Sequence, residues 1–428
     1  MSRSPSVGRR AVLRAAQSAS LFAMLGEAGC RRAERDSQGR VRLRLWHSLG
    51  GRPRAALLEI VRRFHEREPG VRVEAVYQGD YFEALAKLRT AVAAGAAPAL
   101  SHVVAEVLPY LARANALEPL GGYDGLGELD LVPALAQSGA FRGGAERPLY
   151  AVPLNRSTPL MYCNGALLRE AGLAPPETWD ELASHAKALT RSGSRWGFEV
   201  PIAWWFWVAM VGQAGGAVFD AEGRATLGGD AGAEAIAFWQ RLIHRDRVMR
   251  PPPGRDYDAW NVTNQDFLSG RAAMIWTSTA FLRYLEDNAK FPVVAAPLPA
   301  KVKRSVPTGG TLFVVMRAAP AIEREAAAKF LRFFCETDQV TLLSQRTGYL
   351  PITRAAVARM EGEGFFASHA NDAIAQRQLA DVEPWPWEPK LFRIQRDIVN
   401  PRLEQAVLLD RDARGLLDEA RRAAARPS

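Results

Sequence analysis

The sequence predicts an α/β protein built of two lobes, each a mainly parallel sheet flanked by helices, with a cleft between the lobes. The chain has 428 residues, more than one hydrophobic core ordinarily serves. Segments with the period of a strand alternate with segments that have the period of a helix, which is typical of parallel sheets covered by helices. Apolar residues make up 48% of the chain and charged residues 24%, a globular composition that excludes a disordered chain and a coiled coil.

The alternation is clearest in the first part of the chain. Leu43 and Leu45 alternate with Arg42 and Arg44, which is the period of a strand. Pro53 then opens a helix with one apolar face, and a Pro-Gly pair ends it. Reading on in the same way, we expect strands at 41–45, 71–75 and 102–105, helices at 53–68, 81–94 and up to about 115, and a long loop region to 147.

The same pattern continues beyond Pro153. The sequence Thr-Trp-Asp-Glu at 178–181 is a capping box, in which the Thr hydroxyl and the Glu carboxylate each satisfy an amide at a helix start. Gly309 and Gly310 precede a second long apolar strand. We expect strands at 158–162 and 309–316, helices at 164–171, from 178 onward, at 233–242 and at 279–287, and mainly helices from 321 to the end.

The uncharged stretch 201–219 could be mistaken for a membrane span. It begins with a cluster of Trp and Phe and ends at Gly215-Gly216, which a lipid-spanning helix would rarely do. We therefore expect a loop that leads into a short buried helix ending near Gly215. Its aromatic residues are either core filler or a platform for a ligand.

The first thirty residues have the pattern of an export signal. Residues 1–14 contain four arginines and no acid, and an apolar run that is too short to span a membrane follows. The segment 8–14, GRRAVLR, resembles the twin-arginine export motif. Ala28-Gly29-Cys30 resembles the end of a lipoprotein signal, although Glu27 departs from that motif. We expect an export signal at 1–30, acylation of Cys30, and a flexible tether at 31–40; alternatively, Cys30 is a bystander in a plain cleaved signal.

The composition and the absence of known motifs argue against nucleic-acid binding, metal binding and several kinds of catalysis. The formal charge of +9 is scattered, with eight basic and three acidic residues in 1–40, so nothing argues for nucleic acid. Three cysteines are too few for a disulfide scaffold or a four-cysteine zinc site, and we expect Cys163 and Cys335 to be buried thiols. The six histidines form no metal motif, and GxSxG, phosphate-loop and GxGxxG motifs are absent. We expect no catalytic residue, no metal and no cofactor.

A group of short motifs runs through nearly all of 41–428. They are LWHSLGG at 45–51, RFHEREPG at 63–70, YQGDY at 77–81, GAAP at 95–98, PLNRSTPLMY at 153–162, FLSGRAAM at 267–274 and RTGYLPIT at 346–353. Together they resemble the extracellular solute-binding proteins (family 1) of ABC importers, and most closely the branch that binds sn-glycerol-3-phosphate. FxxGxxAM and GYLPI are shared by the whole family, whereas WHS-GG, NxSTP and a spaced Trp pair are more specific to that branch.

The resemblance implies a two-lobed periplasmic-binding-protein fold of type II. The implied function is that of an exported, monomeric, non-enzymatic protein that captures sn-glycerol-3-phosphate or a related glycerophosphodiester by hinge closure and delivers it to permease subunits in the membrane. The alternatives are a neutral sugar or oligosaccharide as ligand, an exported hydrolase with a dispersed site, or a ligand-sensing partner of a membrane receptor. The implied organisation is lobe 1 at 41–153, lobe 2 at 154–305, a return to lobe 1 at 306–350, and C-terminal helices at 351–428 packed mainly on lobe 2.

The resemblance also implies a set of ligand-binding residues. Glu106 matches an acidic position only after a shift of one residue, and Arg393 or Arg402 would replace Arg396 in a shifted alignment. Arg156 stands where the family has a small polar residue; it would either narrow the pocket or add a phosphate donor. The full set is Tyr81, Glu106, Ser157, Trp204, Trp207, Ser278, Gly310, Tyr349 and Arg396.

These residue types suit a phosphorylated polyol. A phosphate ester is anionic and offers strong acceptor oxygens, so it requires hydroxyls, backbone amides and a guanidinium. Gly310 would let a backbone amide approach the ligand because it has no Cβ. A carboxylate can accept from the glycerol hydroxyls, and a Trp ring can cover the carbon skeleton. Without the resemblance, a Ser in a turn and an Arg on a late helix are as well explained by capping and by solvation.

Overall fold

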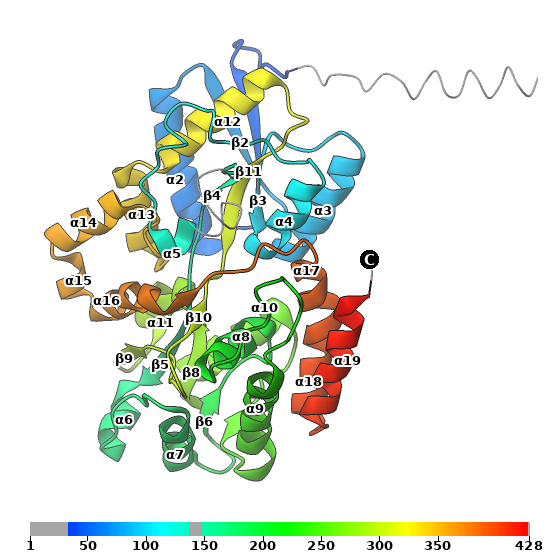
Figure 1. The fold of residues 1–428 in the computed structure, drawn as a ribbon. Helices are drawn as coiled ribbons and strands as arrows, with labels where there is room; N and C mark the ends of the chain where they lie inside the picture. Colours follow the sequence, from blue (N-terminus) through cyan, green and yellow to red (C-terminus); the bar gives the residue numbers. More distant parts are fainter. Residues whose placement is uncertain (1–32, 137–147, 427–428) are drawn as a thin grey trace, which may run out of the picture.

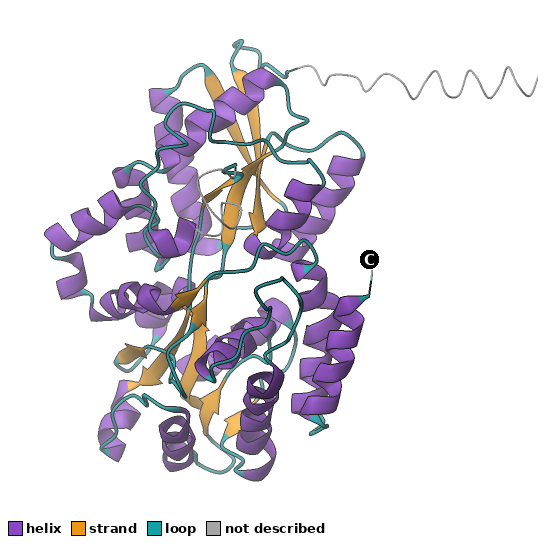
Figure 2. Ribbon diagram, in the orientation of Figure 1, coloured by secondary structure: helices purple, strands orange, loops and turns teal. Residues whose placement is uncertain are grey.

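The computed structural model describes residues 33–136 and 148–426. Two five-stranded sheets, each covered by helices, form two lobes that lie one above the other (Figures 1 and 2). The expected export signal and Cys30 lie outside the described residues.

Lobe 1 is built on a sheet with the strand order β2-β1-β3-β11-β4. Its core includes the inward residues of β1, which alternate between buried and half-buried as the sequence pattern predicts. The strands are β1 (Val41–His47), β2 (Val71–Tyr77), β3 (Leu100–Val104), β4 (Ala151–Pro153) and β11 (Thr311–Val315). The helices of this part are α2 (Gly51–Arg67), α3 (Tyr81–Ala93), η1 (Ala105–Val107), α4 (Leu108–Arg113), α5 (Pro133–Ala136), α12 (Ala321–Phe334) and α13 (Thr337–Thr347).

Lobe 2 is built on a sheet with the strand order β7-β6-β8-β5-β9. The strands are β5 (Pro159–Asn164), β6 (Trp196–Glu199), β7 (Met249–Arg250), β8 (Ala272–Ser278) and β9 (Val293–Ala296). The helices that follow them are α6 (Gly165–Ala171), α7 (Trp179–Leu189), α8 (Trp204–Gln213), α9 (Gly229–Gln240), η2 (Arg241–Arg245), α10 (Asp256–Leu268), η3 (Thr279–Phe281) and α11 (Leu282–Asn288).

The C-terminal part of the chain is mainly helical, as predicted. Helix α14 packs on α13, α16 packs on β9, and α18 and α19 both pack on α9 along the side of lobe 2 (Figure 1). The elements are α14 (Arg354–Gly362), α15 (Phe365–Ser368), α16 (Ala370–Arg377), η4 (Gln378–Asp381), β12 (Val382–Glu383), α17 (Leu391–Arg393), η5 (Ile394–Val399), α18 (Asn400–Leu408) and α19 (Ala413–Ala425). The short strand β12 pairs with β10 (Val306–Pro307).

Both sheets are mainly parallel, as predicted, and each contains one strand that runs against the other four. In lobe 1, β11 is antiparallel to β3 and β4, and in lobe 2, β5 is antiparallel to β8 and β9. Both β5 and β11 are reached by a chain that has just crossed from the other lobe. Each of them therefore enters its sheet from the end that faces the cleft and runs against its neighbours, while strands that follow a local helix run toward the cleft.

The two crossing segments lie against each other. The backbone amide of Gly309 donates to the Ser157 carbonyl at 2.7 Å, and the Ser157 amide donates to the Gly309 carbonyl at 3.3 Å. A third segment joins them, because the Leu350 amide donates to the Arg156 carbonyl at 2.9 Å. Three parts of the chain that are far apart in sequence thus meet where the lobes join.

Two local predictions differ from the structure. The described part of the expected tether folds back on β1: Arg35 forms an antiparallel bridge with Val41, and Glu34 pairs with Arg42 at 3.3 Å. In the predicted capping box, the Thr178 hydroxyl does accept from its helix, but the carboxylate of Glu181 accepts from the amide of Glu177 instead.

Other predictions of this kind are confirmed. The uncharged stretch forms the short buried helix α8, which ends at Gln213. In the ranges 33–136 and 148–426, no helix has both the length and the hydropathy of a membrane span. Cys163 and Cys335 are buried, and burial raises the pKa of each thiol to about 12.

Candidate functional site

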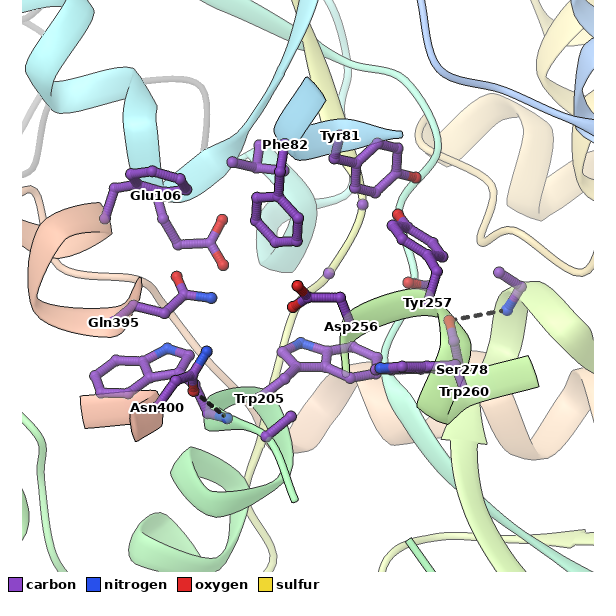
Figure 3. A pocket seen from close by; sticks show the side chains of 18 of the residues that line it. Tyr81, Phe82, Glu106, Trp205, Asp256, Tyr257, Trp260, Ser278, Gln395 and Asn400 are labelled. Carbon is purple, nitrogen blue, oxygen red and sulfur yellow. Dashed lines mark hydrogen bonds between the residues drawn. The ribbon is translucent and has the colours of Figure 1, made fainter. Parts of the chain in front are cut away.

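A pocket with a cavity volume of about 200 Å³ lies where the two lobes meet (Figure 3). It is found at the carboxyl ends of β3 and β8, which is where α/β sheets usually bind ligands. Its walls come from both lobes and from the crossing segments. They are formed by Tyr81, Phe82, Val104, Glu106, Ser157, Ala203, Trp204, Trp205, Asp256, Tyr257, Trp260, Ser278, Ala280, Phe281, Gly309, Gly310, Tyr349, Phe392, Gln395 and Asn400.

Seven of the nine residues that we predicted for ligand binding line this pocket. They come from sequence positions as far apart as α3 and the segment after α13. The seven are Tyr81, Glu106, Ser157, Trp204, Ser278, Gly310 and Tyr349.

The structure places Trp207 in the core of lobe 2 and not in the pocket wall. Its side chain is fully buried, and its indole Nε1 donates to the Gly232 carbonyl at 3.1 Å. Trp207 is three residues further along α8 than Trp204, which carries it about 4.5 Å deeper into the lobe. Trp205, at the first turn, faces the pocket instead.

Arg396 lies beside the pocket but does not line it. Its Nη1 is 2.5 Å from Oδ1 of Asp256, and its guanidinium lies 3.8 Å from the centre of the Phe82 ring. Asp256 is itself a lining residue, at the start of α10. Arg396 therefore already has a carboxylate partner and a cation–π contact that reaches across to lobe 1.

The start of α3 is held by a complete capping box that the sequence analysis did not detect. Oδ1 of Asp80 accepts from the amides of Phe82 and Glu83 at 2.7 and 2.8 Å, and the Glu83 carboxylate accepts from the Asp80 amide at 3.1 Å. The pattern Asp-x-x-Glu at 80–83 is the signal that could have revealed it. This cap fixes Tyr81 and Phe82 at the edge of the pocket.

A chain of hydrogen bonds orients the hydroxyl of Tyr81. Nδ2 of Asn155 donates to it at 2.7 Å, and Oδ1 of Asn155 accepts from both the amide and the hydroxyl of Thr311. The Thr311 hydroxyl also lies 3.0 Å from Nδ1 of His102, and burial lowers the pKa of this imidazole to about 3, so it is neutral. The Tyr81 hydroxyl also shares hydrogen bonds with the hydroxyls of Tyr257 and Tyr349, so Asn155 and the three tyrosines form one polar network at the pocket wall.

Glu106 is the acidic lining residue of lobe 1. It lies on the short helix η1, directly after β3, and its carboxylate points into the pocket (Figure 3). Burial raises the pKa of Glu106, and the positive charge of Arg156 opposes that rise. A half-buried carboxylate of this kind can accept hydrogen bonds from hydroxyl groups of a ligand.

Lobe 2 contributes an aromatic wall, of which the sequence analysis gave only the stretch 201–219 as a possible ligand platform. The rings of Trp205 and Trp260 are 5.3 Å apart, and Phe281 lies 6.2 Å beyond Trp260. Tyr257 reaches across the pocket, with its ring 5.6 Å from that of Tyr81 (Figure 3). The spacing of an acid and two aromatics in Asp-Tyr-Asp-Ala-Trp at 256–260 could have marked the first turn of α10 as a candidate.

The small residues of the pocket have local roles as well. Oγ of Ser278 accepts from the Ala280 amide at 3.1 Å and so caps the helix that follows. Gly310 has a φ of +85°, and a Cβ there would lie 1.8 Å from the Asn155 carbonyl oxygen. Only glycine therefore fits at 310, where the crossing segments come together.

The charges around the pocket balance. Two carboxylates, Glu106 and Asp256, line it. Arg396 pairs with Asp256, and the positive charge of the fully buried Arg156 acts on Glu106. Within 33–136 and 148–426, no group of three or more metal-ligating side chains could hold a metal ion.

The sequence matches the family model of the bacterial extracellular solute-binding proteins over residues 59–371. The chain belongs to this family. A solute-binding protein of an ABC transporter, from Thermotoga lettingae, is among the solved structures that share its fold.

Named relatives are similar over most of their length. The sn-glycerol-3-phosphate-binding periplasmic protein UgpB of Escherichia coli K12 is 27% identical over 362 residues, which is 80% of this chain and 81% of the relative. UgpB of Salmonella typhimurium LT2 is 27% identical over 361 residues, with the same coverage of both chains.

Solved structures show the same two-lobed fold. UgpB from Mycobacterium tuberculosis, in complex with glycerophosphocholine, has a TM-score of 0.79 and 25% identity, and covers 90% of this chain and 98% of its own. Maltose-bound MalE3 of T. maritima has a TM-score of 0.78 at 21% identity, covering 90% of this chain and 98% of its own. The second likeness shows the fold alone.

Proposed function

We propose that this protein captures a glycerophosphodiester in the pocket between its lobes and delivers it, chemically unchanged, to the permease of an ABC importer. The observation that carries the proposal is the charge balance of the pocket. Two carboxylates and two guanidinium groups already neutralise one another, so the pocket suits a ligand of low net charge. The UgpB relatives, one of them in complex with glycerophosphocholine, support a glycerol phosphate ligand.

The charge balance favours a diester over the monoester sn-glycerol-3-phosphate. A phosphomonoester brings about −1.5 to −2 charges at neutral pH, which the pocket would leave largely uncompensated. A phosphodiester brings one negative charge, and a zwitterionic diester such as glycerophosphocholine brings none overall. The hydroxyl groups of three lining residues can bind the phosphate oxygens: those of Tyr81, Ser157 and Tyr349.

The aromatic wall suits a cationic alcohol group on such a diester. Trp205 and Trp260 present two neighbouring rings, and Asp256 lies between them and lobe 1 (Figure 3). A quaternary ammonium is stabilised by ring faces and by a nearby carboxylate. Glu106 would accept from the glycerol hydroxyls at the other end of the pocket.

Closure of the lobes would complete this site. The contacts of Tyr81 with Tyr257, and of Phe82 with Arg396, already join lobe 1 to lobe 2 across the pocket. Because the ligand would touch both lobes only when they are close together, its binding favours the closed form. We further propose a monomer, exported through the twin-arginine route and anchored by acylated Cys30.

A neutral sugar or oligosaccharide is the second candidate ligand. Paired aromatic rings and two carboxylates are also what a sugar requires, since rings cover its apolar face and carboxylates accept from its hydroxyls. The charge balance suits a neutral ligand equally well, and the UgpB relatives, one of them in complex with glycerophosphocholine, are what favour the diester.

Calorimetric titration of the mature protein with glycerophosphocholine, sn-glycerol-3-phosphate and maltose tests the proposal. We expect glycerophosphocholine to bind at least tenfold more tightly than sn-glycerol-3-phosphate and maltose not to bind. Recovery of the ligand after incubation, followed by phosphorus NMR, should show the diester intact. Tight binding of maltose alone would overturn the proposal, and hydrolysis of the diester would make the protein an enzyme.

A further inference from the structure

Arg156 occupies an unusual place in this fold. It lies in the first crossing segment, between Asn155, which holds Tyr81, and Ser157, which lines the pocket. Its carbonyl accepts from the Leu350 amide at 2.9 Å, and the next residue is bridged to Gly309. The backbone at 156 is thus fixed by both of the other segments that meet where the lobes join.

The side chain of Arg156 is a fully buried cation. None of its surface is exposed, and its Nη2 donates to Oγ1 of Thr308 in the second crossing segment at 2.6 Å. Burial lowers the pKa of Arg156 to about 10, while the carboxylate of Glu106 opposes that change. The guanidinium therefore remains protonated at neutral pH, and the acid that its charge acts on is a lining residue of the pocket.

A buried charge acts more strongly on a ligand than an exposed one does. Arg396, the other cation near the pocket, is 27% exposed and pairs directly with Asp256. Solvent and salt screen an exposed charge, whereas a charge in the protein interior is screened much less. Arg156 also cannot turn away from the pocket, since its backbone is fixed and its guanidinium is tied to Thr308.

We infer that Arg156, rather than Arg396, is the residue that makes the pocket select a phosphate-bearing ligand. The inference rests on the proposed function and adds to it the residue that determines specificity. Arg156 does not line the pocket, and its guanidinium is bonded to Thr308, the neighbour of the lining residue Gly309, so it acts on the ligand through its electric field and not through a contact. Arg396 then serves to hold Asp256 and to close the pocket against Phe82.

The test compares Arg156→Met, which keeps the length of the side chain and removes its charge, with Arg156→Lys, which keeps the charge. Calorimetry with glycerophosphocholine should show at least a tenfold weaker affinity for the Met variant and a change of less than about threefold for the Lys variant. Arg283→Met is the matched control, because Arg283 is a buried arginine that pairs with Asp372 at 2.6 Å and does not line the pocket. That control should bind as the wild type does.

The outcomes separate the inference from the proposed function. If wild-type protein binds no phosphodiester, the proposed function fails; if it binds one and Arg156→Met binds equally well, only the inference fails. Equal losses in the Met and Lys variants, or an equal loss in Arg283→Met, would show a structural role and would also overturn it.

The pH dependence of the wild-type protein gives a second measurement if the Met variant does not fold. Protonation of Glu106, whose pKa burial raises, would leave the charge of Arg156 unopposed. The other charged groups facing the pocket are Asp256 and its partner Arg396, which remain paired. Protonation also removes an acceptor for the glycerol hydroxyls, and this loss is common to all glycerophosphodiesters. The affinity for the anionic diester glycerophosphoglycerol, relative to that for the zwitterionic glycerophosphocholine, should therefore rise as the pH falls toward the raised pKa of Glu106. This ratio should stay constant with pH in Glu106→Gln, and a constant ratio in the wild-type protein as well would overturn the inference.

Discussion

The substitution Glu199→Gln should remove a specific pH dependence of stability. Glu199 ends β6, is fully buried, and faces Asp266 of α10, the helix whose first turn lines the pocket. Burial, and secondly the negative charge of Asp266, raise the pKa of Glu199 from 4.5 to about 8, although Arg250 acts in the opposite direction. The folded protein therefore keeps a proton on Glu199 at neutral pH.

The size of the effect follows from this pKa. The unfolded chain releases the proton near pH 4.5 and the folded protein near pH 8, so the folded state binds more protons in between and stability falls as the pH rises through that window. Each pH unit in the window corresponds to about 1.4 kcal/mol. Between pH 6.5 and 8.5, the wild-type protein should lose about 2 kcal/mol of unfolding free energy from this group.

The buried histidines act in the opposite direction at the lower end of this range. Burial lowers the pKa of His47 to about 4 and that of His102 to about 3, both from 6.5. The unfolded chain binds the extra protons in these cases, so stability falls as the pH drops below about 6.5. In the unfolded chain both imidazoles are half protonated at pH 6.5 and nearly neutral at pH 7.5, so together they raise stability by about 0.7 kcal/mol between these values, in the wild-type protein and in Glu199→Gln alike.

Urea unfolding at pH 6.5, 7.5 and 8.5, followed by tryptophan fluorescence, measures the prediction. Glu199→Gln keeps a donor toward Asp266 but cannot ionise, so its stability should lack the loss of about 2 kcal/mol and should instead rise by about 0.7 kcal/mol from the histidines. Glu361→Gln, on the exposed surface of α14, should follow the wild type. The reasoning is refuted if Glu199→Gln loses stability with pH as steeply as the wild-type protein.

Two further predictions concern the pocket. Trp207→Ala should destabilise the fold by about 3–5 kcal/mol in urea unfolding, because it leaves a cavity in the core. Trp205→Ala should mainly weaken glycerophosphocholine binding, by about tenfold in calorimetry. The reverse pattern would exchange the roles of the two rings. Asp256→Asn should free Arg396 and raise the affinity for sn-glycerol-3-phosphate relative to glycerophosphocholine by about fivefold in the same titrations. An unchanged ratio of the two affinities would contradict the charge-balance argument.

Local sequence patterns predicted much of the fold because strands and helices are encoded by short-range periodicity. The strand beginning at Val41 and the helix beginning at Tyr81 are both present, and both Gly309 and Gly310 precede β11 as expected. The direction of β5 and β11 was not predictable in this way. It depends on which lobe the chain has just left, and periodicity carries no information about that.

The lining residues of the pocket were predictable where they lie within a distinctive sequence motif. Ser157, Gly310 and Tyr349 lie in segments with distinctive sequences, and all three line the pocket. It was harder to predict which aromatic residues of α8 line the pocket, since four of them are crowded into one turn. Which ring faces the pocket depends on where the helix starts and on what packs behind it, and α9 covers Trp207.

The amino-acid sequence by itself determined the order of the elements, the family and seven of the twenty residues that line the pocket, because these follow from local patterns and shared motifs. Only the tertiary structure decided how charges and rings pair across the lobes. It joined Arg396 to Asp256, placed Arg156 in reach of Glu106, and set Trp260 beside Trp205. Such pairings join residues that are far apart in sequence, so their energies depend on distances that exist only after the chain has folded.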